Sequence, residues 1–490
     1  MSEATSEAGS EGMPEAMRGA GSAAVSEGAG SGAGAAAVSE AESGPGPGAA
    51  PAPAPADTSA RRDTPEALRQ EARERDAADP LAPLRARFLL DGAGPAAGPD
   101  RDGSGTGGGT VYLDGNSLGA LPLSVPGRLA RVVEHEWGRL RIRGWTEAGW
   151  WEAPERIGER IAPLVGAGRG QVVVGDSTSV NVFKAVVGAV RIARAESAGR
   201  TEILVDAATF PTDGYIARSA ARLTGCTVRA VAPAEVPAEA GPSTAAVLLG
   251  HVDYRTGELH DLPGITAAVR AAGALTVWDL CHSAGALPVE LDAHGVDFAV
   301  GCTYKFLNGG PGSPAFLYVR RALQPRFDSP LPGWNSHTDP FAMDPEYEAA
   351  DGAARGRVGT PDILAMAALE EALTVWDGVD PAAVRAKSLA LTDFFLRCVA
   401  VHVPDGEADG GGRRVTVRSL TPAEHARRGS QIALLCAPQE AAEEVMEALI
   451  ARGVVGDFRR PGVLRFGFTP LYTAFADAER AARTLGEVTR

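Results

Sequence analysis

The sequence predicts an α/β fold, with a mostly parallel central sheet flanked by helices and a smaller α+β C-terminal domain. Short apolar runs alternate with helical patterns between residues 172 and 319, as in strands joined by right-handed crossovers. After about residue 345 this alternation stops, and strand-like segments at 414–420 and 431–437 precede a helix. A chain of 490 residues is also longer than one typical domain. We therefore expect two packed domains.

Composition divides the chain further. Residues 1–60 are mostly Ala, Gly, Ser, Glu and Pro, and such a segment buries too little apolar surface to offset the entropy lost on ordering. We expect a disordered tail at 1–63, with an interaction tail as the alternative. The other expected parts are a helical segment at 64–124 that packs with the small domain and carries a glycine-rich insert at 91–109, a large domain at 125–345, and a small domain at 346–490.

Charge and cysteine content exclude several classes of function. The net charge is −15, of which residues 1–60 carry −7, so we expect no basic surface for nucleic acid. The five cysteines form no CxxC pair and indicate reduced thiols in the cytoplasm. The acidic N-terminus lacks the apolar core of a secretory signal, and no run of 18 apolar residues predicts a membrane span.

The individual elements are predicted as follows, in chain order. Thr64 and Pro65 mark a helix start, and a longer helical stretch at 125–165 is interrupted by an aromatic cluster. The segment GDSTS at 175–179 opens a helix that runs to about residue 195, and a last helix follows a strand at 463–468. The apolar runs interpreted as strands of the central sheet are 172–174, 203–205, 245–252, 275–278, 296–301 and 315–319.

Two strand ends carry the residues on which the functional hypothesis depends. The run 275–278 stops at Asp279, and the run 296–301 leads to Lys305 and a Gly/Pro-rich turn. Polar groups at strand ends point into the ligand crevice of an α/β sheet. Pyridoxal phosphate is held as a Schiff base on a lysine while a carboxylate protonates its pyridine nitrogen, so this pair indicates that cofactor. The alternative is a surface lysine, although the only other lysines, Lys184 and Lys387, fall in helical patterns.

Three further positions have both a functional and a structural interpretation. The hydroxyl residues of GDSTS lie at a helix N-terminus, which binds phosphate, but Ser177 or Thr178 can equally be a plain N-cap. Phe210 can stack on a planar ring with Asp213 at its edge, or the segment is a proline turn with a capping residue. A buried Arg465 either grips an amino-acid carboxylate or forms an internal salt bridge.

Taken together, eight segments resemble kynureninase, a pyridoxal-phosphate enzyme of fold type I with aspartate-aminotransferase-like architecture. They run in the family's order over residues 112–490, so the tail and the glycine-rich insert lie outside the resemblance. The segments are LDGNSLG (113–119), DSTSVNVFK (176–184), FPTDGYIA (210–217), HVDYRTG (251–257), WDLCHSAGA (278–286), GCTYKFLNGGPGS (301–313), PGWNSH (332–337) and RFGFTPLY (465–472).

The resemblance implies hydrolysis of L-kynurenine to anthranilate and L-alanine, a step of tryptophan degradation, by a homodimer that shares its active sites. It also implies catalytic roles for Lys305, Tyr304 and Asp279, with Tyr304 relaying protons. The implied cofactor-binding residues are Thr178, Ser179, Phe210, Pro211, Thr212, Asp213, Asp279, His282, Tyr304, Lys305, Trp334 and Thr360. The implied substrate-binding residues are Asn116, Ser117, Trp145 and Arg465. No metal is expected, because Asp279 and His282 have no third ligand at a sensible spacing.

The sequence departs from the family pattern at several positions. Gly250 stands where relatives place a hydroxyl that contacts the phosphate, and Asn335 replaces an aromatic residue. Trp145 and Thr360 stand where animal members, which prefer 3-hydroxykynurenine, carry histidine and asparagine. We therefore expect a preference for unsubstituted L-kynurenine, with 3-hydroxykynurenine as a further substrate.

Two alternative functions stay open at this point. A cysteine desulfurase, or another lyase of the same fold, needs a nucleophilic cysteine on an exposed loop, whereas Cys398 and Cys436 lie in apolar patterns. A non-catalytic cofactor-binding regulatory protein would have no need to retain Lys305, Asp279 and Arg465 together.

Overall fold

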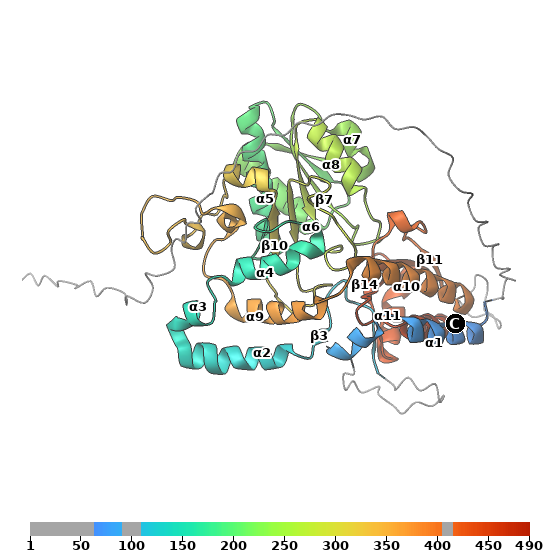
Figure 1. Ribbon diagram of the computed structural model, residues 1–490. Helices are drawn as coiled ribbons and strands as arrows, with labels where there is room; N and C mark the ends of the chain where they lie inside the picture. Colours follow the sequence, from blue (N-terminus) through green and yellow to red (C-terminus); the bar gives the residue numbers. More distant parts are fainter. Residues whose placement is uncertain (1–62, 91–108, 404–414) are drawn as a thin grey trace, which may run out of the picture. The chain divides into compact units, whose positions relative to one another are not determined.

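Seven strands form the central sheet, in the order β4-β10-β9-β8-β7-β5-β6 (Figure 1). The computed structural model describes residues 63–90, 109–403 and 415–490, so the tail predicted at 1–63 and the insert at 91–109 fall almost wholly outside the described residues. Strand β10 is antiparallel to both neighbours, and every other neighbouring pair is parallel, so the sheet is mostly parallel as predicted. The strands are β4 Val172–Val174, β5 Glu202–Asp206, β6 Thr227–Val231, β7 Thr244–Gly250, β8 Leu275–Asp279, β9 Phe298–Gly301 and β10 Phe316–Val319.

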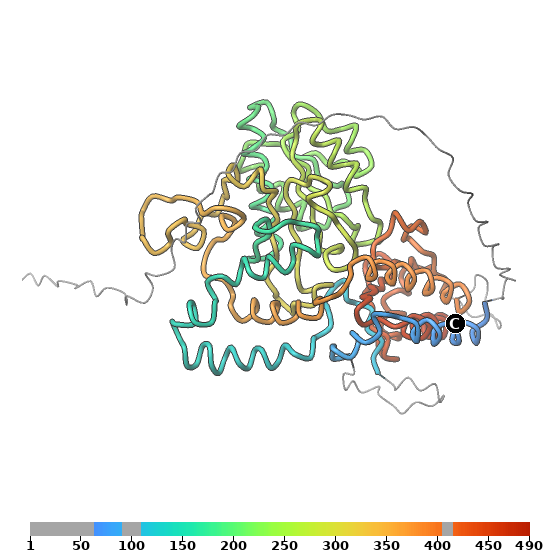
Figure 2. The backbone as a smooth tube through the Cα atoms, in the orientation of Figure 1, coloured from blue at the N-terminus to red at the C-terminus, as the bar shows by residue number. Residues whose placement is uncertain are grey.

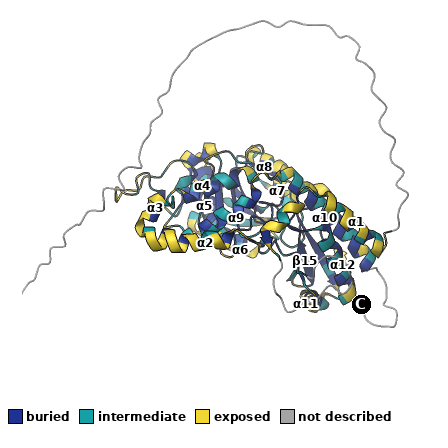
Figure 3. Cartoon of the chain, turned by 60° about the horizontal axis from the view of Figure 1, so that its bottom comes forward, coloured by how far each residue is buried: buried dark blue, intermediate teal, exposed yellow. Residues whose placement is uncertain are grey.

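Helices cover both faces of this sheet, which explains why its strands read as continuous apolar runs. Side chains alternate between the faces: in β5, Ile203 and Val205 belong to one buried cluster and Leu204 to the other. Helices α5 and α6 pack on the first face, and α4, α8 and α9 on the second, leaving the interior buried (Figure 3). These helices are α4 Ala153–Ile161, α5 Thr178–Glu196, α6 Pro211–Thr224, α8 Leu262–Ala271 and α9 Ile363–Ala372, with the short α7 Val236–Glu239 before α8.

A second, antiparallel sheet of order β11-β12-β15-β14 lies in the C-terminal part, with helices packed around it. Helix α1 packs beside α10 and α12 through Leu68 and Ala72, so the start of the described chain lies against its end (Figure 2). The elements are β11 Thr416–Ser419, β12 Gln431–Ala437, β14 Asp457–Arg459, β15 Val463–Gly467, α1 Pro65–Ala78, α10 Pro381–His402, α11 Ala442–Ala451 and α12 Phe475–Val488.

Some elements differ from the sequence-based prediction. Strand β6 was not predicted, because it is an edge strand whose residues TVRAV are mostly not buried and so form no apolar run. The helical stretch predicted at 125–165 is broken where Arg141 adopts a positive φ of 56°. Its pieces are α2 Val125–Arg131, the π-helix η3 Val132–Leu140, α3 Gly144–Glu147 and α4. The sequence also did not predict four short strands, which are β1 Phe88–Leu89, β2 Val111–Tyr112, β3 Leu121–Pro122 and β13 Val454–Val455.

The described residues 63–490 form one compact unit. The domain boundaries expected near residues 124 and 345 therefore stay predictions. No helix in the described ranges combines the length and the apolar character needed to cross a bilayer.

The two lysines that the sequence places in helices are buried rather than ordinary surface residues. Lys184 on α5 donates to Asp176 Oδ2 at 2.8 Å and to the Gly356 carbonyl at 2.7 Å. Lys387 on α10 forms an ion pair of 2.6 Å with Asp79, and both side chains are buried. Each ammonium group is thus committed to an internal partner, as a buried charge requires.

Candidate active site

The polar residues singled out by the sequence meet at the carboxyl ends of the parallel strands. The loops after β5, β7, β8 and β9 enclose a cavity of about 130 Å³, and the loop before α5 closes one side. This is the edge at which α/β sheets bind their ligands. The predicted site residues that line the cavity are Thr178, Ser179, Phe210, Thr212, Asp213, Asp279, His282, Tyr304 and Lys305, together with Gly250. Pro211 does not line it.

Lys305 lies four residues beyond β9 and reaches the centre of this cavity. Its ammonium nitrogen is 2.9 Å from His282 Nε2, and His282 follows β8 on the neighbouring strand. The preceding loop is fixed by Thr303, whose hydroxyl donates to the Pro314 carbonyl at 2.6 Å. The lysine is thus not a free surface residue but the end of a rigid, hydrogen-bonded loop.

Two carboxylates, Asp213 and Asp279, lie side by side in the same cavity. Asp213 is in the first turn of α6 and is buried, while Asp279 ends β8 and accepts from the Cys281 amide at 2.8 Å. Burial raises the pKa of Asp213 well above its ordinary value, and the neighbouring Asp279 raises it further. A buried carboxylate with a second carboxylate beside it needs a hydrogen-bond donor or a cation as its partner, so the pair suits a cationic donor.

The start of α5 lies at the end of the site where the sequence predicts phosphate binding. Ser177 is the N-cap, and its hydroxyl accepts from the Val180 amide at 3.4 Å, so the structural interpretation holds for this residue. The next two hydroxyls, Thr178 and Ser179, are left on the first turn of a 19-residue helix. The positive end of a helix dipole and its free amides attract an anion such as phosphate.

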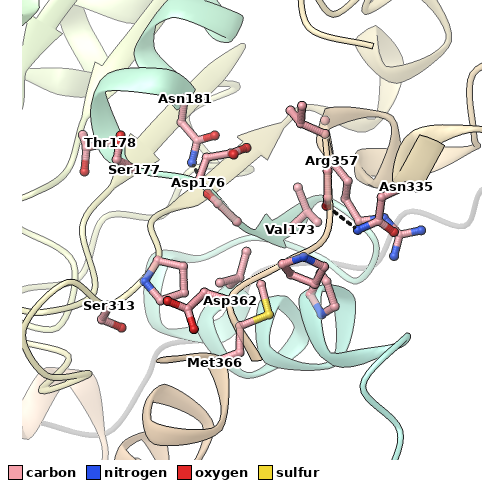
Figure 4. Close-up of a pocket in the computed structure, with 18 of the residues that line it drawn as sticks. Val173, Asp176, Ser177, Thr178, Asn181, Ser313, Asn335, Arg357, Asp362 and Met366 are labelled. Carbon is pink, nitrogen blue, oxygen red and sulfur yellow. Dashed lines mark hydrogen bonds between the residues drawn. The ribbon is translucent and has the colours of Figure 1, made fainter. Parts of the chain in front are cut away.

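A second cavity, of about 510 Å³, adjoins the first at this helix start (Figure 4). The two cavities share Thr178, Ser179 and Tyr304. Asn335 and Thr360 lie on the opposite wall of the larger one, where the Asn335 amide donates to the Gly359 carbonyl at 3.0 Å. Asn335 and Thr360, two positions at which the sequence departs from the family pattern, therefore lie close to the predicted anion end.

Phe210 is the residue before α6 and is 48% exposed, with its ring edge-on to Tyr254 at a centroid distance of 5.2 Å. Pro211 begins the helix, as its fixed φ favours. No side chain caps the start of α6, so the alternative of a capping Thr or Asp is not observed. The ring is free to stack on a planar ligand in the cavity that it lines.

Arg465 is buried in β15, and it forms an ion pair with Asp457 of β14 and donates to the Tyr254 carbonyl. The internal salt bridge, one of its two interpretations, is therefore present. Burial lowers the pKa of Arg465, and its buried Nε has no hydrogen-bond partner. Ser117 joins the ion pair, since its hydroxyl is 3.2 Å from Asp457 Oδ2 and 3.3 Å from Arg465 Nη2.

Asn116 connects this arginine cluster to the lysine. Its amide donates to Gln431 Oε1 at 3.3 Å, and the same oxygen is 3.0 Å from His282 Nδ1. Gln431 begins β12 and was missed by the sequence reasoning. A buried glutamine at the head of the apolar run QIALLCA was the available signal, because a buried amide needs partners.

Six predicted residues line neither cavity of the site: Asn116, Ser117, Trp145, Pro211, Trp334 and Arg465. Trp145 packs edge-on against Trp150 and Trp151, with ring centroids 5.9 and 6.2 Å apart. Trp334 is 39% exposed and packs on Trp151 at 5.4 Å. Neither lines either of the two cavities of this site, so their roles toward cofactor and substrate stay predictions.

The cysteines do not form the exposed nucleophile that a desulfurase requires. Burial raises the thiol pKa of Cys398 to about 12 and that of Cys436 to about 11. Cys281 and Cys302 are also buried, and the half-buried Cys226 lines neither cavity of the site. Within the described ranges, no cluster of three or more His, Cys, Asp or Glu side chains could hold a metal ion.

The donors present fit pyridoxal phosphate. Lys305 supplies the amine, and the carboxylate pair Asp213 and Asp279 supplies acceptors for a protonated ring nitrogen. Thr178 and Ser179 at the start of α5 suit the phosphate, and Phe210 offers a flat face. A protonated ring nitrogen beside the two carboxylates would supply the cationic partner that a buried carboxylate needs.

Comparison with known proteins gives the family. Residues 112–400 match the family model "Aminotransferase class-V", and residues 384–485 match "Kynureninase C-terminal domain". Kynureninase of Pseudomonas fluorescens is 44% identical over 84% of this chain and 93% of its own length. Kynureninase of Deinococcus radiodurans is 47% identical over 84% of this chain and 94% of its own. The chain belongs to the kynureninase family.

Solved structures of lower identity share the fold of this kynureninase-family chain. The cysteine desulfurase CsdA of Escherichia coli superposes with a TM-score of 0.65 over 83% of this chain and 98% of its own, at 19% identity. A C-DES mutant with glycine covalently linked to its PLP cofactor gives a TM-score of 0.64 over 79% and 99%, at 18% identity. These likenesses confirm the predicted fold type I architecture and carry no information on substrate.

Proposed function

We propose that this chain is a kynureninase, a hydrolase that cleaves L-kynurenine to anthranilate and L-alanine with pyridoxal phosphate bound at Lys305. One observation carries the proposal: in a chain of the kynureninase family, the Lys305 amine shares one cavity with the carboxylates of Asp213 and Asp279. When bound, the cofactor withdraws electrons from the substrate, so that the α-proton can leave and the Cβ–Cγ bond can break.

The chain's own residues would hold the cofactor at three points. Asp279, with Asp213 beside it, would keep the ring nitrogen protonated, and the position of both carboxylates in the cavity of Lys305 supports this assignment. Thr178 and Ser179 bind the phosphate with the N-terminus of α5, and Tyr304 closes that end. The remaining cofactor contacts proposed from the family are those of Phe210, Thr212, His282, Trp334 and Thr360.

Lys305 acts as the proton carrier once substrate has displaced it from the cofactor. His282 assists by accepting a hydrogen bond from the lysine amine, 2.9 Å away. Burial lowers the pKa of His282 well below its ordinary value, and the charges of Lys305 and Arg465 lower it further. The imidazole therefore stays neutral and cannot compete with the lysine as a proton donor.

Tyr304 is the proposed proton relay for the later steps, in which water adds to the γ-carbonyl, Cγ leaves as the carboxylate carbon of anthranilate and Cβ takes up a proton. Burial raises the pKa of its phenol, so the hydroxyl keeps its proton at neutral pH. Tyr304 lines both cavities and lies next to Lys305 in the chain. It can therefore reach a substrate that lies where the two cavities meet.

Arg465 is proposed to bind the substrate carboxylate. The residue is already paired with Asp457, so the substrate shares the guanidinium through its unpartnered Nε or displaces the aspartate. Asn116 and Ser117 lie around this arginine cluster and are proposed to line the same side.

The proposed substrate is unsubstituted L-kynurenine rather than the 3-hydroxylated form. Binding of a 3-hydroxyl would need polar side chains such as the histidine and asparagine of animal members. This chain has the indole of Trp145 and the short hydroxyl of Thr360 at those positions instead. We also propose a homodimer with shared active sites, because Trp145 and Trp334 line neither cavity of their own chain and Trp334 is exposed. The five free cysteines support a cytoplasmic location.

The experiment is to mix cofactor-loaded protein with L-kynurenine or 3-hydroxykynurenine and to follow anthranilate fluorescence, beside a Lys305→Ala control. We expect turnover of L-kynurenine that is absent in the control. The ratio of kcat/KM for the two substrates tests the assignment of Trp145 and Thr360. Lack of turnover despite absorbance from lysine-bound cofactor would refute the proposed substrate and leave another amino acid on the same fold.

A further inference from the structure

A chain of hydrogen bonds runs from the lysine of the large sheet to the first residue of β12 in the C-terminal sheet. Lys305 Nζ is 2.9 Å from His282 Nε2, and His282 Nδ1 is 3.0 Å from Gln431 Oε1. His282 and Gln431 are both buried, so the contact between them is shielded from solvent. The orientation of the lysine therefore depends on a residue about 126 positions away in the sequence.

The orientation of the Gln431 amide is determined by its other contacts. Its NH₂ group faces two backbone carbonyls, that of Tyr254 at 3.1 Å and that of Asp253 at 3.4 Å. A flipped amide would place an oxygen against both of them. Oε1 is therefore the atom that faces His282, and it also accepts from Asn116 Nδ2 at 3.3 Å. Because Oε1 can only accept, His282 Nδ1 must carry a hydrogen and donate it.

We propose that Gln431 is a positioning residue, which holds His282 as the Nδ1–H tautomer so that the Nε2 lone pair faces and orients the Lys305 amine. The proposal rests on the proposed function for its catalytic consequence, but not for the tautomer itself. With the other tautomer, Nε2–H would face the lysine ammonium, and two donors would oppose each other across 2.9 Å. A neutral imidazole accepts at one nitrogen only, so the amide on its far side decides which nitrogen that is.

The same network reaches the arginine proposed to bind the substrate carboxylate. Arg465 donates to the Tyr254 carbonyl, the oxygen to which Gln431 also donates. Gln431 also lies opposite Gly467 in the pairing of β12 with β15, two residues beyond Arg465. A single backbone oxygen thus joins the proposed carboxylate-binding group to the glutamine that orients the lysine.

The test uses three variants of the cofactor-loaded protein. Gln431→Met keeps the length of the side chain and removes its hydrogen bonds, whereas Gln431→Glu keeps the acceptor for His282. Gln324→Met is the matched control, because Gln324 is also a buried glutamine that donates to backbone carbonyls, at 2.7 and 3.1 Å, but it belongs to neither cavity of the site.

The decisive readout is the nitrogen NMR spectrum of histidine-labelled holoenzyme, with the His282 signals assigned through a His282→Gln variant. We expect the Nδ1–H form in the wild type, in Gln431→Glu and in Gln324→Met, and loss of that form in Gln431→Met. For kynurenine turnover we expect kcat of Gln431→Met to fall on the order of tenfold or more, which is part of the roughly 10²–10⁴-fold that general acid–base catalysis supplies, with KM changed less. Gln431→Glu should retain more activity, with a pH profile displaced from that of the wild type.

Either of two results would overturn the proposal: the Nε2–H form in wild-type holoenzyme, or an unchanged His282 spectrum in Gln431→Met. If Gln431→Met does not fold, the wild-type spectrum and the behaviour of Gln431→Glu decide the matter. A wild type that shows the Nδ1–H form but does not turn over kynurenine would refute the proposed function and leave the tautomer assignment standing. Normal kcat in a Gln431→Met variant that has lost the Nδ1–H form would refute the catalytic role.

Discussion

Replacing Asp114 with asparagine is expected to stabilise the cofactor-free protein at pH 8, and this gain should shrink as the pH falls below about 6, to roughly half at pH 5. Asp114 follows β2 and has a buried Oδ1 without a hydrogen-bond partner. Burial raises its pKa from 3.8 to about 6, since the Ser117 hydrogen bond and Arg465 offset that effect only in part. The folded-state pKa lies above the unfolded value. The group's contribution to stability is therefore fully present below pH 3.8 and is lost as the pH rises through about 6.

The magnitude follows from the size of that shift. About two pKa units correspond to about 3 kcal/mol, at about 1.4 kcal/mol per unit. Asp114 is only partly buried, so solvent screening reduces the expected gain at pH 8 to about 1–3 kcal/mol. An asparagine keeps the shape of the neutral carboxyl and removes the cost of ionising it.

The assay is urea unfolding of the wild type and Asp114→Asn at about pH 5 and at pH 8. Glu71→Gln serves as a control of opposite sign: burial works against ionisation of Glu71, but the hydrogen bonds and charges of Arg397 and Arg75 together outweigh burial and lower its pKa. That variant should lose stability at pH 8 and approach the wild type as the pH falls. The reasoning about Asp114 is refuted if Asp114→Asn is no more stable than the wild type at pH 8, or if its advantage is as large at pH 5.

Three further predictions address the site and the core. A side chain fits at Gly250, where an added Cβ meets nothing nearer than a backbone oxygen at 3.8 Å. Gly250→Ser should therefore bind pyridoxal phosphate more tightly, as measured by cofactor dissociation. Thermal unfolding should show unchanged stability. Lys387→Met should lower the free energy of unfolding by about 3–5 kcal/mol, because Asp79 is left as a buried, unpaired charge, and urea unfolding should show recovery when Asp79→Leu is added. Trp145→His combined with Thr360→Asn should raise the ratio of kcat/KM for 3-hydroxykynurenine over kynurenine, and an unchanged ratio would remove both residues from specificity.

The sequence was sufficient to predict the large sheet and the position of the lysine. Strands buried on both faces leave continuous apolar runs, and their ends are visible wherever such a run meets a polar residue, as at Asp279. The edge strand β6 left no such run, because its polar side chains, Thr227 and Arg229, alternate with apolar ones. The break in the helical stretch at Arg141 was also hidden, since no proline or glycine marks that residue.

The sequence was much less informative about partners. It identified Arg465 as a buried cation but not the carboxylate that binds it, because Asp457 comes from a neighbouring strand whose pairing is a tertiary property. Lys184 and Lys387 were interpreted as ordinary helix residues for the same reason, because their acceptors come from other parts of the chain. Each ammonium group in fact donates to a buried acceptor. Helical periodicity shows which face is buried but not what a charged residue on that face meets.

The arrangement of the site explains why the C-terminal sheet is part of the chemistry and not only of the fold. The proposed proton carrier, Lys305, belongs to the large sheet, whereas both Gln431 and Arg465 belong to the second sheet. The Tyr254 carbonyl, from the loop after β7, accepts from both of them. A substrate whose carboxylate draws Arg465 away from Asp457 would alter the hydrogen bond of Arg465 to the Tyr254 carbonyl. Because Gln431 donates to the same carbonyl, its hydrogen bond to His282 would change as well. Binding at the arginine and orientation of the lysine are therefore expected to be coupled, so that loss of Gln431 should affect substrates bearing a carboxylate more than a kynurenine analogue without one.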